Sequence, residues 1–257
     1  MTGSRILLFG PPGAGVPLAL EALRRAGLDV VASEGQIASD PLLEEAVAQD
    51  RKAWLVGLEG ADLSCLGRRD AAWSATSLPD HLDSALFALA SARERLLPAR
   101  LRADLLLDTG QLSALELRAR LGQLRPQLWG GDATPVLESF AYTRGVPLDL
   151  DWCLDARGLR NPYWEPELRL RSGLDPEVEG FVLGQAQAQG LLEQAQAAVA
   201  TWLPELRRGG RRRALRLAIG CTGGFHRSVA LVEELGRRLR RDSLPHLVWH
   251  RDLPGPD

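Results

Sequence analysis

The stretch LAIGCTGGFHRSVALVEEL, residues 217–235, decides the fold of the second half of this chain. It begins with apolar residues that are typical of a buried strand, and it ends with apolar residues at the spacing of an amphipathic helix. Two adjacent glycines lie between these parts. The stretch therefore predicts a strand, a tight turn and a helix, which together form the repeating unit of parallel α/β sheets.

The turn in this stretch, from Cys221 to Ser228, is dense in groups that bind anions. Glycines let backbone N–H groups approach a bound group closely, and a helix that begins near His226 directs the positive end of its dipole into the turn. Arg227 adds a guanidinium, and Thr222 adds a hydroxyl. We expect a phosphate or a sugar phosphate to bind here, with Arg227 donating hydrogen bonds to the phosphate.

Two other functions remain open for the same turn. Its C-x5-R-S spacing is that of the cysteine phosphatases, in which a thiolate attacks phosphorus while the loop and the arginine hold the oxygens. Gly220 rather than histidine precedes Cys221, and no segment resembles a general-acid loop, so we assign no catalytic residue. The third alternative is a purely structural turn between a strand and a helix.

A second glycine loop lies near the N-terminus, in GPPGAGVP. Gly10, Gly13 and Gly15 follow a predicted strand and precede a predicted helix, as in the phosphate-binding loop G-x-x-x-x-G-K-[ST]. Val16 stands where the lysine would neutralise phosphate, and Pro17 stands where a hydroxyl would hold Mg²⁺. ATP or GTP are the cofactors of such a loop, and we expect them to bind poorly because both contacts are lost.

Strands alternate with helices along the remainder of the chain, which indicates an α/β fold with parallel sheets. The predicted strands include RILLFG, KAWLVGLEG and ADLLLDTGQ, then PVLESFAY, LDWCLDAR, ALRLAIG and HLVWHRDL, and residues 174–209 predict one long helix. Prolines and glycines in residues 125–135 mark a domain boundary. We predict a P-loop NTPase-like parallel-sheet domain over residues 1–130 and a smaller α/β domain over residues 134–257.

The composition is that of a globular protein, with 45% hydrophobic and 25% charged residues. A net charge of −2 excludes a surface that is basic overall, so any RNA would have to bind a local patch. Three scattered cysteines without a CxxC pair argue against a zinc site or a disulfide scaffold and favour a reducing compartment. No apolar run approaches the roughly 20 residues of a membrane span, so we expect a cytoplasmic protein without a membrane partner. From the cysteine pattern we expect no metal site.

Several motifs together resemble the RapZ family, the bacterial RNase adapters and nucleotide-binding proteins that are also known as the YvcJ family. The similarity is carried by ESFAYTRGVP, NPYWEPELR, IGCTGGFHRSV and HRDL, and it is dense from about residue 134 to residue 253. In the N-terminal half it is patchier and includes GPPGAG and LLLDTGQLSALELRARL. The FKYG pattern of the family reads YTRG here, with Thr143 at the position of the lysine.

The resemblance implies a P-loop-type domain followed by a C-terminal domain that binds small RNA and a sugar phosphate, which is glucosamine 6-phosphate in the enterobacterial member. Such an adapter presents a small RNA to an endoribonuclease and thereby controls RNA processing and amino-sugar synthesis for the envelope. The expected partners are therefore a sugar phosphate, a small RNA, an endoribonuclease and, in a homo-oligomer, further copies of the chain. An ATP- or GTP-binding protein with weak nucleotidase activity is the alternative function.

The resemblance also implies a set of pocket residues in this sequence. They are Cys221, Thr222, Gly223, Gly224, His226, Arg227, Ser228, Asn161, Tyr163, Arg169 and His250. Two basic runs, RRGGRRR at residues 207–213 and RRLRR at residues 237–241, are either solvated helix ends or a surface for an RNA backbone.

Overall fold

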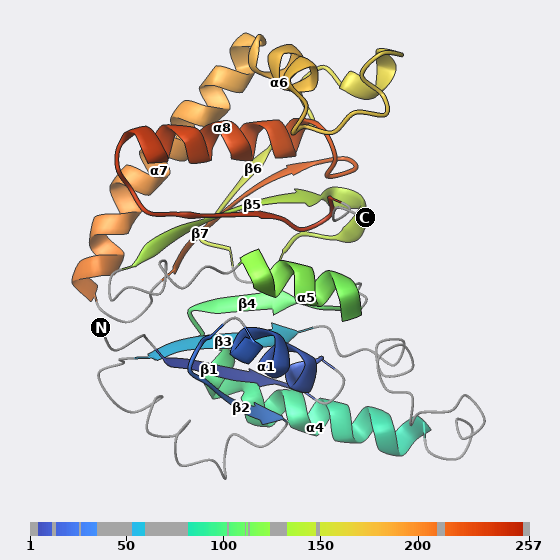
Figure 1. Cartoon of the computed structure of the whole chain (residues 1–257), viewed down its shortest axis with the longest axis vertical. Helices are drawn as coiled ribbons and strands as arrows, with labels where there is room; N and C mark the ends of the chain where they lie inside the picture. Colours follow the sequence, from blue (N-terminus) through green and yellow to red (C-terminus); the bar gives the residue numbers. More distant parts are fainter. Residues whose placement is uncertain are drawn as a thin grey trace. The chain divides into compact units, whose positions relative to one another are not determined.

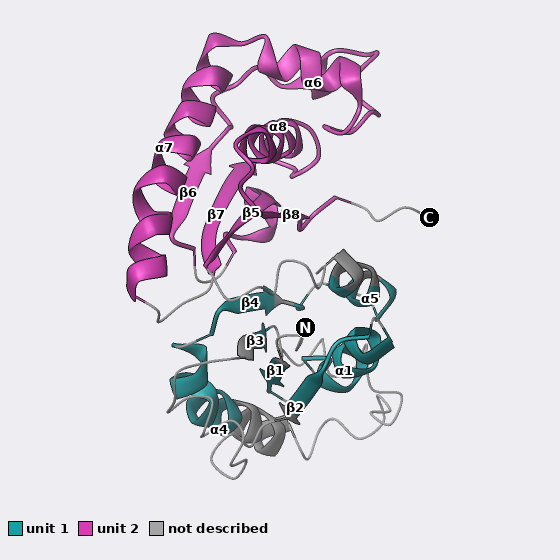
Figure 2. Cartoon of the chain, turned by 60° about the vertical axis from the view of Figure 1, so that its left-hand side comes forward, with its two compact units in different colours: residues 1–131 teal, residues 132–257 magenta. Residues whose placement is uncertain are grey.

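The structure is a computed structural model, and it describes residues 5–11, 14–25, 27–34, 53–59, 82–101, 103–110, 112, 114–123, 133–147, 150–209 and 214–253. Gly13 of the N-terminal glycine loop and residues 210–213 of the first basic run lie outside the described residues. The chain divides into two compact units, residues 1–131 and residues 132–257 (Figure 2). Each unit holds a four-stranded parallel sheet with helices, which confirms the predicted α/β class.

The N-terminal unit has the strand order β2-β1-β3-β4, and all three pairings are parallel. Its elements are β1 (Arg5–Gly10), α1 (Val16–Arg25), β2 (Val30–Glu34), β3 (Ala53–Glu59), α4 (Leu82–Arg100), β4 (Leu105–Asp108) and α5 (Ala114–Gln123). Leu7 and Phe9 of β1 pack with Leu96 of α4 and Leu106 of β4 in a buried cluster. This arrangement is consistent with the P-loop-like domain that the sequence predicts.

The C-terminal unit has the strand order β6-β7-β5-β8, again with parallel pairings throughout (Figure 2). Its elements are β5 (Thr134–Ala141), the 3₁₀ turn η4 (Tyr142–Arg144), β6 (Trp152–Asp155), the 3₁₀ turn η5 (Pro162–Trp164), α6 (Pro176–Leu183), α7 (Ala186–Gly209), β7 (Ala214–Cys221), α8 (Arg227–Arg241) and β8 (Leu247–His250). Because the strands are parallel, their last residues meet at one edge of the sheet, which we call the carboxyl edge.

The core of the C-terminal unit forms where α7 and α8 pack on β7 and its neighbours (Figure 1). Every residue of β7 is buried, as expected for an interior strand of a parallel sheet. Leu217 and Ile219 of this strand pack with Leu231 and Leu235 of α8 in the largest apolar cluster. The stretch quoted first therefore folds as predicted, and it supplies both the central strand and the helix that covers it.

The long helix predicted over residues 174–209 is wrong in one respect, because the structure divides it into α6 and α7. Helix α6 ends at Leu183, and Gly184 caps it with a backbone N–H that bonds to the carbonyl of Gly180. The side chain of Gln189 then bonds back to the carbonyl of Leu183 at 2.8 Å. Glycine has a poor helix propensity, so Gly184 is a natural place for the chain to change direction.

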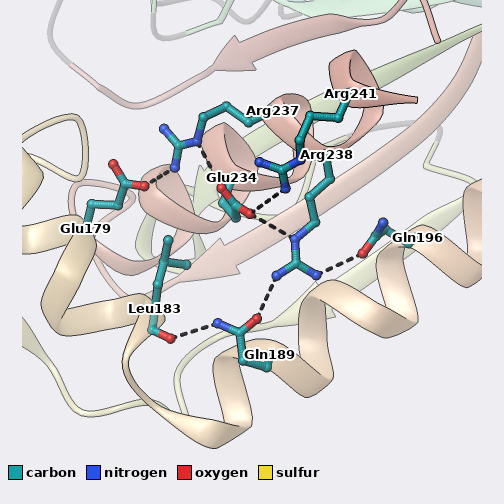
Figure 3. A network of polar contacts seen from close by, with 8 residues as sticks. All are labelled: Glu179, Leu183, Gln189, Gln196, Glu234, Arg237, Arg238 and Arg241. Carbon is teal, nitrogen blue, oxygen red and sulfur yellow. Dashed lines mark hydrogen bonds and ion pairs between the residues drawn. The ribbon is translucent and has the colours of Figure 1, made fainter. Parts of the chain in front are cut away.

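A polar network fastens α8 to α6 and α7 (Figure 3). Arg237, Arg238 and Arg241 of α8 share the carboxylate of Glu234, at 2.9, 2.9 and 3.2 Å. Their further partners are side chains on the other two helices: Glu179, Gln189 and Gln196. Three arginines of the second basic run are thus bonded inside the unit, and the use of this run as an RNA surface stays a prediction.

Two kinds of feature are absent from the described part of the chain. No helix there is both long enough and apolar enough to cross a bilayer. No three His, Cys, Asp or Glu side chains come together there in a way that could hold a metal ion.

Candidate functional site

The N-terminal glycine loop joins β1 to α1 in a closely packed turn. A Cβ on Gly10 would lie 2.9 Å from the carbonyl oxygen of Leu58 and 3.0 Å from the side chain of Val16. Val16 itself is only 2% exposed, and Gly15 adopts a φ of 89°. The loop therefore keeps a backbone conformation that requires glycine, while a buried valine occupies the position of the phosphate-binding lysine.

The Cys221 turn lies at the carboxyl edge of the second sheet, between β7 and α8. Gly224 adopts a φ of +63°, and a Cβ there would lie 2.9 Å from the backbone nitrogen of Ala141 and 3.0 Å from Cβ of Asp252. Gly223 differs, since its Cβ would meet nothing within 4 Å. The turn therefore packs tightly at Gly224 and leaves Thr222 and Gly223 open to solvent.

Cys221 lies beneath this turn rather than on its open side. Its side chain belongs to the apolar core and is 2% exposed. Its Sγ lies 3.1 Å from Oγ of Ser228, a residue of α8 that is fully buried. A thiol that acts as a nucleophile must contact its substrate, so this burial gives no support to the phosphatase alternative.

Arg227 joins the turn to the segment that follows β6. It is 4% exposed, and its Nη1 donates to the carbonyl oxygens of Arg157 and Leu159, at 3.0 and 2.9 Å. Nη2 donates to Oγ1 of Thr222 at 3.2 Å. Its Nε is buried, and no described residue accepts a hydrogen bond from it. The guanidinium is thus largely engaged with the protein, and Nε is the donor that remains for the phosphate contact predicted from the sequence.

Two further contacts attach the same segment, residues 157–175, which we call the strap. Nε2 of His226 donates to the carbonyl oxygen of Arg169 at 3.2 Å, and the backbone N–H of Gly173 donates to the carbonyl oxygen of Phe225 at 2.8 Å. The imidazole also packs edge-on against the ring of Phe225. The strap is therefore held against the turn and the beginning of α8 at several points.

Asn161, Tyr163 and Arg169 form a cluster of their own within the strap. Oδ1 of Asn161 accepts a hydrogen bond from the backbone of Tyr163 at 3.3 Å. The guanidinium of Arg169 lies over the ring of Tyr163, 4.9 Å from its centre, and Nε donates to the carbonyl of Tyr163. The structure thus brings these three predicted residues together and connects them to the turn through the bond from His226 to Arg169.

His250, at the end of β8, has protein partners on both ring nitrogens. Nδ1 lies 2.8 Å from Oγ of Ser139, and Nε2 lies 2.9 Å from Oε1 of Glu233. The hydrogen bond from His250 holds the pKa of Glu233 below its usual range. The three side chains therefore connect β5, β8 and α8 by hydrogen bonds. Because Ser139 is fully buried, its hydroxyl is not accessible as a nucleophile.

A polar group at the end of β6 was not predicted from the sequence. Asp155 pairs in register with Gly220, so its carboxylate lies next to the beginning of the turn. Hydrogen bonds from Arg157 hold the pKa of Asp155 below its usual range. The guanidinium of Arg157 lies 4.0 Å from the ring centre of Tyr142, whose pKa burial raises to about 12. Asp155 lies near the end of the predicted strand LDWCLDAR, which indicated a place toward the carboxyl edge, but the sequence did not show that this strand would pair with β7.

Arg251 and Asp252 belong to the HRDL motif, and the structure shows what their side chains contact. Nη2 of Arg251 donates to the carbonyl oxygens of Ala141 and Gly145, at 3.2 and 2.7 Å. Oδ2 of Asp252 accepts a hydrogen bond from the backbone of Ala141 at 2.6 Å. These two side chains fix the end of β5, which is the surface against which Gly224 packs.

Burial of His226 predicts a pH dependence of stability. Desolvation, together with the charge of Arg227, lowers the pKa of His226 below that of a free histidine, about 6.5. The folded state therefore binds fewer protons than the unfolded state, and stability falls as the pH drops below about 6.5. We expect a smaller loss of melting temperature between pH 7 and pH 5 for His226→Gln than for the wild type.

Thermal unfolding at several pH values measures this difference. His246→Gln is the matched control, because His246 lies between α8 and β8 and its ring bonds to the nearby carbonyl of Leu244 at 2.8 Å. A change of pH dependence that His226→Gln shows and His246→Gln does not would assign the titration to His226. An equal loss in His226→Gln and in the wild type would assign the titration to another group.

Comparisons with known proteins bear on both units. A family profile described as the RapZ C-terminal domain matches residues 134–254. A nucleotide-binding protein of Methylococcus capsulatus (strain ATCC 33009 / NCIMB 11132 / Bath) is 33% identical in an alignment that covers 98% of this chain and 96% of that protein. This relative therefore extends the similarity through the N-terminal unit as well.

Two further relatives match a shorter part of the chain at higher identity. A nucleotide-binding protein of Corynebacterium jeikeium (strain K411) is 44% identical over 161 residues, 63% of this chain and 55% of that protein. One of Frankia alni (strain DSM 45986 / CECT 9034 / ACN14a) is 45% identical over 163 residues, 63% of this chain and 56% of that protein. In these two matches the chain spans about half the length of the relative.

Proposed function

Because this chain belongs to the RapZ family, we propose that its C-terminal unit is a sensor for a phosphorylated metabolite of the amino-sugar phosphate type. The phosphate binds at the open side of the Cys221 turn, over Thr222 and Gly223. The occupied sensor then controls RNA processing or amino-sugar metabolism through a small RNA and an endoribonuclease, the partners that the family resemblance implies.

The observation that carries this proposal is the buried Nε of Arg227, which has no acceptor among the described residues. A buried donor that makes no hydrogen bond costs about 1–3 kcal/mol, so a site that leaves one open is suited to a ligand that supplies the acceptor. The donor lies at the first residue of α8, where the helix dipole also favours an anion. Gly223 leaves the space above the turn open.

The sugar end of the ligand is recognised by the polar groups beside the turn. Asp155 ends the strand next to β7, and its carboxylate, which pairs with Arg157 at 2.7 Å, is exposed and would also accept a hydrogen bond from an ammonium group. Asn161 and Tyr163 belong to the strap that the turn holds in place. A ligand with a phosphate at one end and an amino-sugar ring at the other would therefore meet complementary groups at both ends.

A thermal-shift titration of the wild-type protein tests the proposed function. Glucosamine 6-phosphate at 100 times its Kd should stabilise the protein by about 2.7 kcal/mol. Inorganic phosphate should raise the melting temperature less, and free glucosamine should leave it unchanged. Stabilisation by glucosamine as strong as that by its phosphate would refute a site built on the anion.

A second candidate function is nucleotide binding by the N-terminal unit, since the relatives are named nucleotide-binding proteins. The buried Val16 argues for weak nucleotide binding, because its side chain has neither the positive charge of a lysine nor the length to reach the phosphates. We expect Mg-ATP and Mg-GTP to bind with a Kd above about 1 mM, or −4.1 kcal/mol. Calorimetry measures this value. A micromolar affinity that Gly15→Ala abolishes would establish the loop as a functional nucleotide site.

A further inference from the structure

The strap depends for its position on the turn and on the beginning of α8. Only three of its residues are buried, namely Leu159, Pro162 and Gly173. It contains no regular element longer than the 3₁₀ turn Pro162–Trp164, and its other backbone hydrogen bonds are mostly local. A segment with so few buried contacts opens at a low free energy, so a single strong hydrogen bond can change how often it opens.

We propose that the strap is a ligand-responsive element, and that the hydrogen bond between Arg227 and Thr222 couples it to the anion site of the proposed function, on which this inference rests. A ligand bound at the turn makes the strap open less often, and loss of the hydrogen bond between Arg227 and Thr222 makes it open more often.

The coupling follows from the geometry of one side chain. The guanidinium of Arg227 is a rigid plane, and its two terminal nitrogens point to different segments. Nη1 holds the carbonyls of Arg157 and Leu159 at the beginning of the strap, while Nη2 holds Oγ1 of Thr222 in the turn. Because the plane does not flex, a shift of Thr222 that reorients the guanidinium also changes both contacts to the strap.

An anion in the turn acts on the same group. It would accept from Nε of Arg227, for which no described residue is an acceptor. The additional bond restrains the guanidinium and therefore the strap carbonyls that it holds. The strap also carries the side chains of Trp164 and Leu170, which are 72% and 88% exposed. A change in how often the strap opens therefore changes how these apolar side chains are presented at the surface.

Hydrogen exchange read by mass spectrometry tests the coupling in the ligand-free protein. Thr222→Val keeps the shape of the side chain and removes the acceptor for Arg227. We expect exchange of strap amides to become about tenfold faster, which corresponds to about 1.4 kcal/mol. Thr143→Val is the matched control, because it removes a hydroxyl that bonds to the carbonyl of Thr222 at 3.0 Å but keeps the backbone N–H that bonds to the same carbonyl at 3.3 Å, so Thr222 stays held in the turn. It should leave strap exchange unchanged.

The second arm uses the wild-type protein with glucosamine 6-phosphate, whose binding is measured separately by calorimetry. Bound ligand should slow exchange in the strap and leave α7 unaffected. Binding without any change in the strap would refute the coupling and leave the proposed function intact. The coupling is also refuted if Thr222→Val exchanges like the wild type or like Thr143→Val. Absence of binding would refute the proposed function and the ligand response together, and the Thr222→Val arm would still decide the coupling.

Discussion

Arg227→Ala is expected to lower the free energy of unfolding of the C-terminal unit by about 3 kcal/mol. The substitution removes a buried charged donor from the carbonyls of Arg157 and Leu159 and from the hydroxyl of Thr222. For a unit of this size the loss corresponds to a fall in melting temperature of about 10 °C. Affinity for glucosamine 6-phosphate should fall about ten- to a hundredfold, since a charge-assisted hydrogen bond contributes about 1.5–3 kcal/mol.

Two variants control this result. Arg227→Lys should recover only part of the stability and of the affinity, because an ammonium cannot hold two segments in one plane. Arg160→Ala removes an exposed arginine of the strap that pairs with Glu165, and it should change stability by less than about 0.5 kcal/mol. Thermal melts followed by circular dichroism compare the three variants. If Arg227→Ala melts like Arg160→Ala, the buried contacts of Arg227 do not hold the strap.

Gly173→Ala should have an effect of similar size for a steric reason. A Cβ at this position would lie 2.2 Å from the carbonyl oxygen of His226 and 2.7 Å from the backbone nitrogen of Ala230. Both neighbours are backbone atoms at the beginning of α8, so neither can move aside as a side chain would. We expect a loss of about 3 kcal/mol, measured by urea unfolding, as the strap is forced away from the helix.

Gly158→Ala is the matched control within the same strap. Its Cβ would meet nothing within 4 Å, and its backbone does not require glycine. The control should unfold within about 0.5 kcal/mol of the wild type. Equal urea midpoints for the two alanine variants would show that the strap does not pack on α8 as described.

The sequence predicted the elements of the C-terminal unit well because their patterns are local. The apolar run before the turn became β7, and the helical spacing after it became α8, which begins at Arg227 within the predicted range. Residues 174–209 show where local pattern fails, since apolar spacing continues through Gly184 although the helix ends there. The glycine was visible in the sequence, but periodicity alone gave it too little weight.

The candidate site was harder to predict because its contacts are distant in sequence. Arg227 was predicted to bind a phosphate from its place in the turn, but its contacts with backbone carbonyls 68 and 70 residues away were not predicted. Backbone acceptors leave no residue-type signal in a sequence. The position of Asp155 beside the turn was hidden for a related reason. It results from the pairing of β6 with β7, and this strand order could not be derived from the order of the strands along the chain.

The most direct test of the account is a calorimetric titration of glucosamine 6-phosphate into the wild-type protein and into Gly223→Ala. The added methyl group would project into the open space above the turn without contacting the protein, so the variant should fold and melt like the wild type. We expect binding to the wild type and at least a tenfold weaker affinity in the variant, or about 1.4 kcal/mol. Equal affinity in a normally folded Gly223→Ala protein would show that the phosphate does not bind at this turn.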